Sequence, residues 1–351
     1  MRVFLTGATG FIGQALVRAM QKRGWHISAL VRDTQGIPAQ WLRQRGVSLV
    51  AGNVTQPNGL AQAMRGFDAV LHNAGVYEFG LDKASAERML QVNVNGTENI
   101  LGAALEASVP RTFHVSSTMA LGPSSYAPNS GTVSDETKTH SGQHLTSYER
   151  SKVEAHQVAL AYRKRGLALN ILMPNSVAGI NDHSIWGYFL RLHLLHAMVP
   201  MAFAKDMVMS IVEVNALADG MCLAIEKAAV GEDYLFAGEP IALHELFQKF
   251  NRYPGGCKVR LWLPRWFMRP QMALLEPLQR WLGLPAFLSR DTVDESKGNF
   301  NFSAAKARRD LGWEHPTLDA MWNDIVQGER ALMNKRKGFL NRLRHQAVVM
   351  D

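Results

Sequence analysis

Residues 6–13 read Thr6-Gly7-Ala8-Thr9-Gly10-Phe11-Ile12-Gly13, between an apolar run at residues 2–6 and a segment of helical periodicity at residues 11–23. The glycines are spaced for a dinucleotide: Gly7 permits a tight turn, Gly10 lets the backbone approach a pyrophosphate, and Gly13 lets the helix pack closely on the strand. The helix N-terminus offers free N–H groups and a positive dipole end to phosphates. The stretch therefore predicts a dinucleotide-binding strand–turn–helix unit; the alternative is a glycine-rich turn without a ligand.

Short apolar runs alternate with helical segments over the first half of the chain. This alternation predicts an α/β Rossmann fold, a doubly wound parallel sheet with crossover helices. The expected strands cover residues 3–5, 26–31, 47–50, 69–71, 112–115, 168–173 and 234–236. The expected helices cover residues 11–23, 41–45, 60–65, 84–107, 148–165, 215–227 and 243–250.

Beyond residue 174 the pattern loosens, which predicts a smaller, discontinuous C-terminal substrate domain over the mouth of the sheet. The expected Rossmann domain covers residues 1–180 and about 205–238. The expected substrate domain covers about 181–204 and 239–328, and residues 329–351 form a basic C-terminal tail.

Composition sets limits on partners and location. The chain has 351 residues, 47% of them hydrophobic, enough for one large or two ordinary domains. Its net charge of +8 is spread without a basic, aromatic-interleaved stripe, so no nucleic-acid partner is expected. The one basic cluster, within residues 335–344, is either a solvated tail or a contact with a membrane surface. No signal-peptide pattern precedes the first strand, so the cytoplasm is the expected location.

Two apolar stretches, residues 185–204 and 262–288, bear on the membrane question. Charged residues or prolines interrupt both, so neither is expected to span a bilayer. Both could line an apolar pocket or rest on a membrane surface. The two cysteines, Cys222 and Cys257, form no disulfide framework, and neither cysteines nor histidines show metal-ligand spacing, so no metal is expected.

The end of the second predicted strand bears on the choice between NAD and NADP. A carboxylate there bonds the ribose 2′-hydroxyl, whereas an arginine pairs with a 2′-phosphate. Arg32 and Asp33 are both present, which leaves the choice open. Arg32 comes first after the apolar run, which favours NADP(H) over NAD(H); the competing interpretation is a solvated loop charge.

Tyr148 and Lys152 stand four residues apart, so a helix places them on one face. An ammonium beside a phenol favours the phenolate, and such a tyrosine can exchange a proton with a substrate oxygen. Ser116 and Ser117 end the preceding parallel strand, where side chains point into the ligand crevice. Chance surface spacing and ordinary strand-end chemistry are the alternatives, but the combination favours a catalytic site.

These motifs together resemble the extended short-chain dehydrogenase/reductase family of the NAD-dependent epimerase/dehydratase type. The resemblance covers roughly residues 1–328 and is closest in appearance to its dihydroflavonol reductase and 3β-hydroxysteroid dehydrogenase-like branch. Besides the glycine loop and the Tyr148/Lys152 pair, it rests on Asn53-Val54, Leu71-His72-Asn73-Ala74-Gly75, Asn93-Val94-Asn95-Gly96-Thr97, Ser116-Ser117, Pro174-Asn175-Ser176-Val177, and the segment from Phe302 to Trp313.

The resemblance implies roles for individual residues. Tyr148 would be the catalytic acid/base, Lys152 would bind the nicotinamide ribose and tune the tyrosine, and Ser117 would orient the substrate oxygen, with Ser116 or Thr118 as alternatives. Arg32 matches the arginine that binds the 2′-phosphate in the dihydroflavonol-reductase-like branch. The implied cofactor-binding set is Gly7, Thr9, Gly10, Phe11, Ile12, Gly13, Arg32, Asn53, Val54, Asn73, Ala74, Gly75, Tyr148, Lys152, Pro174 and Val177.

Two departures from the family pattern matter. The usual aspartate near the adenine is Asn53 here. Thr118-Met119 stands where sugar dehydratases carry an Asp-Glu pair, so a 4,6-dehydratase is set aside.

The substrate is less defined, and three hypotheses follow. Aromatic residues of the second half, with many Met and Leu, suit a pocket for a bulky apolar molecule, although core packing explains most of them. The first hypothesis is an oxidoreductase that interconverts a ketone and a secondary alcohol on such a molecule with an exchangeable cofactor. The second is a sugar-nucleotide epimerase that retains NAD, and the third is a non-catalytic cofactor-binding protein. The resemblance also implies a homodimer through the helices around Tyr148 and residues 84–107.

Overall fold

A computed structural model describes residues 1–128, 130–255, 258–282 and 286–344. Its centre is a seven-stranded parallel sheet in the order β10-β6-β5-β4-β1-β2-β3. The strands are β1 (Arg2–Thr6), β2 (His26–Val31), β3 (Ser48–Ala51), β4 (Ala69–His72), β5 (Arg111–Val115), β6 (Leu169–Pro174) and β10 (Tyr234–Phe236). The predicted doubly wound Rossmann sheet is therefore confirmed.

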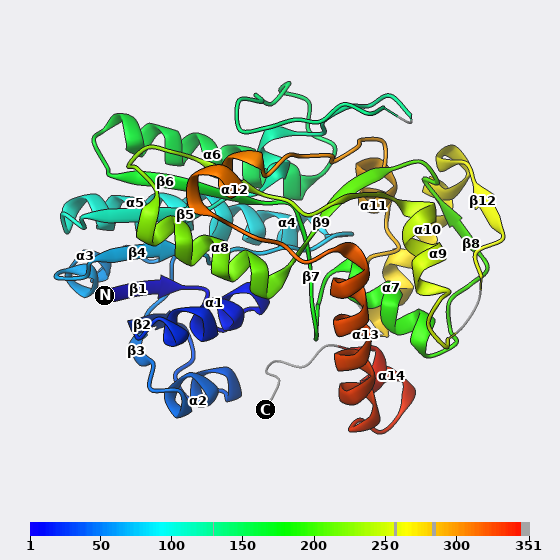
Figure 1. Ribbon diagram of the computed structural model, residues 1–351, viewed down its shortest axis with the longest axis horizontal. Coiled ribbons are helices and arrows are strands. Elements are labelled where there is room, and N and C mark those ends of the chain that lie inside the picture. Colours follow the sequence, from blue (N-terminus) through cyan, green and yellow to red (C-terminus); the bar gives the residue numbers. More distant parts are fainter. Residues whose placement is uncertain (129, 256–257, 283–285, 345–351) are drawn as a thin grey trace.

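Helices cover both faces of this sheet (Figure 1). One layer contains α1 (Phe11–Lys22), which packs on α8 (Val214–Lys227). The other contains α3 (Leu60–Met64), α5 (Gly96–Glu106) and α6 (Ser147–Lys164), with α5 between the other two. Every residue of β4 and β6 is buried, as expected for central parallel strands that are covered on both sides.

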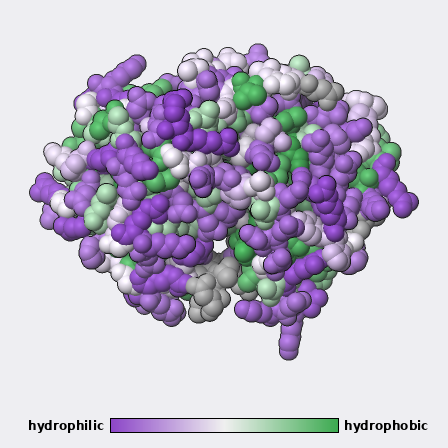
Figure 2. Space-filling view, viewed as in Figure 1, coloured by the Kyte–Doolittle hydropathy of each residue, from purple (hydrophilic) through white to green (hydrophobic). Residues whose placement is uncertain are grey.

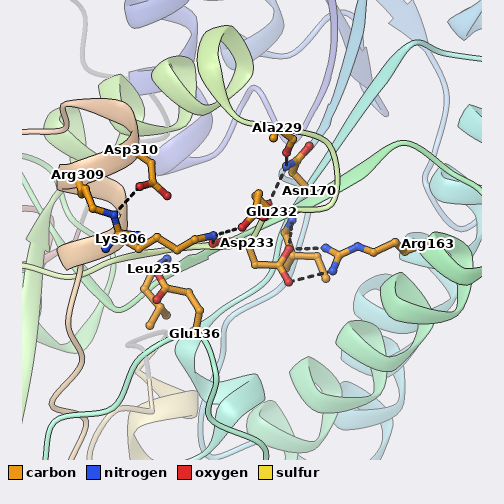
Figure 3. A network of polar contacts seen from close by, with 11 residues as sticks. Glu136, Arg163, Asn170, Ala229, Glu232, Asp233, Leu235, Lys306, Arg309 and Asp310 are labelled. Carbon is orange, nitrogen blue, oxygen red and sulfur yellow. Dashed lines mark hydrogen bonds and ion pairs between the residues drawn. The ribbon is translucent and has the colours of Figure 1, made fainter.

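The edge strand β10 is held against β6 by a polar network that draws on distant parts of the chain (Figure 3). Arg163 of α6 makes a bidentate ion pair with Asp233, whose carboxylate also accepts from the amide of Ile171 at 2.9 Å. Asn170 donates from Nδ2 to two carbonyls of the loop that precedes β10. Lys306 of α12 (Ala305–Leu311) donates to the Asp233 carbonyl at 2.8 Å. These contacts join β6, β10 and α12.

The part of the chain to the right in Figure 1 consists of short strands and helices. A three-stranded sheet has the order β11-β9-β7, with β7 (Ser176–Ala178), β9 (Val208–Glu213) and β11 (Pro240–Ala242). A second small sheet pairs β8 (Met201–Phe203) with β12 (Leu261–Leu263). The helices here are α7 (Ile185–Leu194), α9 (Leu243–Phe250), α10 (Arg265–Trp281), α11 (Arg290–Glu295), α13 (Leu318–Asn334) and α14 (Phe339–Leu343).

Two helices differ from the prediction. Residues 84–107 are not one regular helix: α4 (Lys83–Leu90) and α5 are joined by a π-helical segment, η1 (Gln91–Asn95). The side chain of Asn93 explains this, because it bonds both the amide and the carbonyl of Val76 and so holds this turn against the loop after β4. The predicted helix at residues 41–45 begins earlier, as α2 (Ile37–Gln44).

The predicted basic tail does not start at residue 329, because α13 continues through that position to Asn334. Glu329 is fully buried and pairs with Arg191 of α7 at 3.3 Å, and Arg191 also donates to the carbonyl of Leu343 at 2.7 Å. Arg336, assigned to a solvated or membrane-bound cluster, is 6% exposed. Glu329 and Leu343 thus tie the ends of this segment to α7. Residues 345–351 lie outside the described part, as does Cys257.

Across the described ranges, no helix is long and apolar enough to cross a membrane. The same residues contain no group of three or more His, Cys, Asp or Glu side chains that could hold a metal ion.

Candidate active site

The glycine loop joins β1 to α1 at the carboxyl edge of the sheet. Gly7 has a φ of +72°, which a side chain would strain, and a Cβ there would lie 2.8 Å from backbone atoms of Ala74. A Cβ on Gly13 would lie 2.0 Å from the carbonyl oxygen of Gly7. Gly10 is the N-cap of α1, and no side chain caps its amides. The backbone of this loop is therefore packed as a phosphate cradle requires, with the helix N-terminus open to an anion.

A buried polar chain fixes the end of β4 beside this loop. Nδ1 of His72 bonds the hydroxyl of Thr6 at 2.8 Å, and its Nε2 bonds the hydroxyl of Thr97 at 3.2 Å. The Thr6 hydroxyl also accepts from the amide of Ala74 at 3.1 Å, and Asn73 donates to the Gly7 carbonyl at 3.4 Å. Burial lowers the pKa of His72 to about 3, so the ring is neutral and serves as a fixed hydrogen-bonding link.

Tyr148 and Lys152 extend from the first turns of α6. Thr146 is the N-cap of this helix, and its hydroxyl accepts from the amide of Glu149 at 3.1 Å. Nζ of Lys152 lies 6.0 Å from the centre of the Tyr148 ring, and burial lowers the pKa of Lys152 to about 8. Tyr148 is 8% exposed and shares a hydrogen bond with the hydroxyl of Ser117.

The pKa of Tyr148 runs against the sequence-based expectation. The sequence predicts a phenol whose pKa is lowered by Lys152. In the structure burial is the largest influence and raises the pKa of Tyr148; the hydrogen bond with Ser117 opposes this rise, and the carboxyl of Glu295 adds to it. Tyr148 is accordingly a protonated phenol near neutral pH, the form that donates a proton.

Three consecutive hydroxyls follow β5, and each has its own partner. The hydroxyl of Ser116 is bonded to Nδ1 of His156 at 3.1 Å. The hydroxyl of Thr118 donates to Oδ1 of Asn175 at 3.1 Å. Ser117 is the member of the three that meets the phenol, which favours it over the two alternatives weighed from the sequence.

Asn93 links α6 to the loop after β4. Its Nδ2 donates to the hydroxyl of Ser151 at 2.9 Å and to the carbonyl of Val76 at 3.0 Å. Ser151 in turn donates to the carbonyl of Tyr148 at 2.7 Å. A Cβ on Gly75 would lie 3.5 Å from Nζ of Lys152, so this loop passes directly over the lysine. The motif at residues 93–97 contributes to the family resemblance, but the sequence-based analysis assigned Asn93 no role in the site.

Tyr77 and Glu295 also face Tyr148, and the sequence-based analysis identified neither. The Tyr77 ring packs edge-on against Tyr148 with centres 4.9 Å apart. Glu295 ends α11, whose first turn is held to the loop after β4 by a bond from the amide of Gly80 to Asp291 at 3.1 Å. Oε2 of Glu295 is shielded from solvent without a hydrogen-bond partner in the described residues. Burial, reinforced by the nearby carboxyl groups of Glu149 and Asp291, raises the pKa of Glu295 to about 8.

The remaining predicted cofactor residues lie at the same edge of the sheet. Arg32 is exposed directly after β2, and Asn53 follows β3 with its Oδ1 accepting from the amide of Thr55 at 3.2 Å. Val54 is buried after β3, Pro174 ends β6, and Val177 lies in β7. On the glycine loop, the Thr9 carbonyl accepts from Gln14 at 3.1 Å. In the first turn of α1, Phe11 meets the ring of His183 edge-on at 5.6 Å and Ile12 is partly buried. On the face in Figure 2 the surface is hollowed between α1 and α13.

Comparisons with known proteins agree with this geometry. The model of the NAD dependent epimerase/dehydratase family matches residues 3–237. A putative dihydroflavonol 4-reductase of Synechocystis sp. is 28% identical, over 92% of this chain and 93% of that protein. A 3 beta-hydroxysteroid dehydrogenase/Delta 5-->4-isomerase of Mycobacterium tuberculosis is 27% identical, over 89% and 86%. The crystal structure of gox2253 is 30% identical with a TM-score of 0.78, over 94% of this chain and 98% of the other.

Proposed function

Since this chain belongs to the NAD dependent epimerase/dehydratase family, we propose that it interconverts a ketone and a secondary alcohol on a bulky, hydrophobic substrate with a nicotinamide cofactor. The chain is an enzyme of the extended short-chain dehydrogenase/reductase family. The observation that carries the proposal is the buried Tyr148, in contact with Ser117 and on the same helix face as Lys152.

The residues of the cradle fit a dinucleotide. A Cβ at Gly7 or Gly13 would collide with neighbouring backbone, so these positions keep the loop and helix close, and the uncapped amides of α1 suit a pyrophosphate. When bound, the nicotinamide supplies or accepts the hydride. Asn73, Ala74 and Gly75 would line the path toward its ribose, beside Lys152.

The proton chemistry falls to the side chains of this protein. Tyr148 is placed to donate its phenolic proton to the oxygen of a ketone as that carbon gains a hydride, and to take the proton back in the reverse direction. Ser117 holds the oxygen by a hydrogen bond, and Lys152 stabilises the phenolate through its positive charge. Tyr77 and Glu295 would border the oxygen that Tyr148 serves, since the Tyr77 ring meets the Tyr148 ring edge-on and the Glu295 carboxyl is near enough to raise the pKa of Tyr148.

A Tyr148→Phe variant tests the assignment. Turnover of a panel of bulky ketones would be followed by oxidation of NADPH and NADH. Loss of a general acid should lower the rate by a factor of about 10² to 10⁴, while cofactor binding persists. Tyr162→Phe, nearly four turns farther along the same helix and beneath the guanidinium of Arg165, is the matched control and should keep full activity. If Tyr148→Phe retains the activity, the catalytic assignment is wrong.

We propose NADP(H) as the preferred cofactor, because Arg32 is exposed at the end of β2 where it can meet a 2′-phosphate. Replacing it by Gln should raise the Kd for NADPH by about tenfold and leave that for NADH nearly unchanged. Equal effects on both cofactors would overturn this preference.

A sugar-nucleotide epimerase is the second candidate, favoured by the family match alone. An epimerase returns the hydride to the same substrate and need not release its cofactor. Denaturing freshly purified protein and identifying the released nucleotide separates the two. Near-stoichiometric NAD would support the epimerase, whereas empty protein that binds NADPH tightly would support the reductase.

Two proposals concern partners. The helices around Tyr148 and residues 84–107 would form a homodimer interface, which light scattering of the purified chain tests.

The basic C-terminal segment would contact a membrane surface through the residues of α14 that its contacts with α7 leave exposed.

A further inference from the structure

Helix α10 displays apolar side chains to solvent. Trp266, Leu274 and Trp281 are 77%, 73% and 81% exposed, values that ordinary core-facing helices do not show for such residues. Phe267, Leu278 and Leu282 are also exposed. With 3.6 residues per turn, positions 266, 270, 274, 278 and 281 share one face, so the exposed side chains form one continuous apolar strip. We call this strip the α10 face.

The orientation of α10 is fixed by polar contacts on its opposite side. Glu276 is 3% exposed, accepts from the amide of Arg290 at 2.7 Å and pairs with its guanidinium. Gln279 is 6% exposed and donates to the carbonyl of Leu288 at 2.7 Å. Rotating the helix to bury the two tryptophans would expose these partners and break both sets of contacts. The α10 face is therefore turned outward by the specific packing of the helix.

Positive charge borders the α10 face. Arg269 and Arg280 are exposed and about three helical turns apart, so they lie on the same edge of the strip. Arg269 is paired with Asp294 of α11 at 3.1 Å, so the charge at this edge is carried mainly by Arg280. Arg344 donates to the carbonyl of Leu282 at 3.1 Å, which places the end of α14 beside the end of α10. α14 adds exposed Phe339 and Leu340 next to the basic residues.

We propose that the α10 face lies on the surface of an anionic lipid bilayer, with Trp266 and Trp281 in the interfacial layer and with Arg280 and the basic end of α14 on lipid phosphates. Tryptophan at both ends of an apolar strip suits the boundary between headgroups and acyl chains, and cationic residues at its edge complement an anionic leaflet. This deepens the membrane contact proposed for the C-terminal segment by assigning it to α10. It rests on the proposed function only for its benefit, which is a route from the bilayer to an apolar substrate.

Vesicle binding by the full chain tests the proposal without any substrate. The protein is mixed with phosphatidylcholine vesicles, with and without phosphatidylglycerol, and sedimented. Binding should require the anionic lipid, weaken with salt, and shift tryptophan emission to shorter wavelength. The double variant Trp266→Ser/Trp281→Ser should lower the partition coefficient by about tenfold or more, because two large apolar side chains no longer insert. The single variant Arg280→Glu should also weaken binding to the vesicles that contain phosphatidylglycerol.

The matched control is Val133→Ser/Val230→Ser, which removes two exposed apolar side chains elsewhere on the surface and should bind as the wild type does. Equal binding of the tryptophan variant and this control would overturn the proposal. The proposal would also be overturned if the wild type does not bind vesicles but forms a stable dimer that Trp266→Ser/Trp281→Ser converts to a monomer. The α10 face would then be an interface between two copies of the chain. Circular dichroism of each variant confirms that the fold is retained.

Discussion

Replacing Glu295 by Gln should make the protein more stable above neutral pH. The carboxyl is held in its neutral form, with a pKa raised from 4.5 to about 8, chiefly by burial. Below about pH 4.5 it is protonated in both the folded and unfolded chain, so it carries no penalty. As the pH rises from there toward 8, the unfolded chain releases the proton while the folded chain retains it, and wild-type stability falls. Glutamine has no proton to lose and avoids this decline.

The structure sets the size of the effect. A tenfold change in proton affinity is worth about 1.4 kcal/mol, so full expression of this pKa change would amount to about 5 kcal/mol. Glu295 is partly exposed as a residue, although its Oε2 is shielded, so solvent screening reduces the expected gain to about 2 kcal/mol.

Urea unfolding at about pH 5 and about pH 8.5 measures this gain. The variant and the wild type should unfold at nearly the same urea concentration at the lower pH, and the variant should resist more urea at the higher pH. Glu314→Gln, at an exposed carboxyl, is the control and should follow the wild type at both. If Glu295→Gln also shows no pH-dependent difference, Glu295 ionises as freely as it does in water, and its description as a neutral group facing Tyr148 is wrong.

Three further outcomes are expected. Gly13→Ala places a Cβ 2.0 Å from the carbonyl oxygen of Gly7, so the loop must shift and the Kd for NADPH, measured by fluorescence, should rise by about a hundredfold or more. Glu329→Leu leaves the buried guanidinium of Arg191 without its carboxylate and should cost about 3–5 kcal/mol in urea unfolding; a loss below about 1 kcal/mol would show that the pair is dispensable. Lys152→Met should lower turnover by about 10² while far-ultraviolet circular dichroism is unchanged, and undiminished turnover would remove Lys152 from the mechanism.

The sheet and the cofactor loop were predictable because their signals are local. Buried parallel strands are continuous apolar runs, and the glycine spacing of residues 7–13 needs no knowledge of the rest of the chain. The same holds for Tyr148 and Lys152, which one helix brings together whatever surrounds it. The seven predicted strands were accordingly all found near their predicted positions.

Residues that depend on long-range packing could not be predicted. Glu295 faces Tyr148 because α11 docks on the loop after β4 through Asp291 and Gly80, a contact between segments over 200 residues apart. The π-helical turn at residues 91–95 and the burial of Glu329 by Arg191 also arise from tertiary contacts. A run of like charges near the C-terminus suggested a solvated tail, because the sequence does not show which carbonyls and carboxylates the arginines will meet.

The edge strand β10 and the covering helix α8 come late in the chain, which has a consequence for synthesis on the ribosome. β6 is covered on its outer edge by β10, and α1 is covered by α8, whose carbonyl at Ala216 accepts from the Trp313 ring nitrogen. α8 begins about 190 residues after α1 ends, roughly ten seconds or more of translation at ordinary rates, and β10 begins 60 residues after β6 ends. During this time the nascent N-terminal half has an unpaired edge on β6 and an uncovered face on α1. A fragment that stops near residue 180 would keep both, and should aggregate when it is expressed alone.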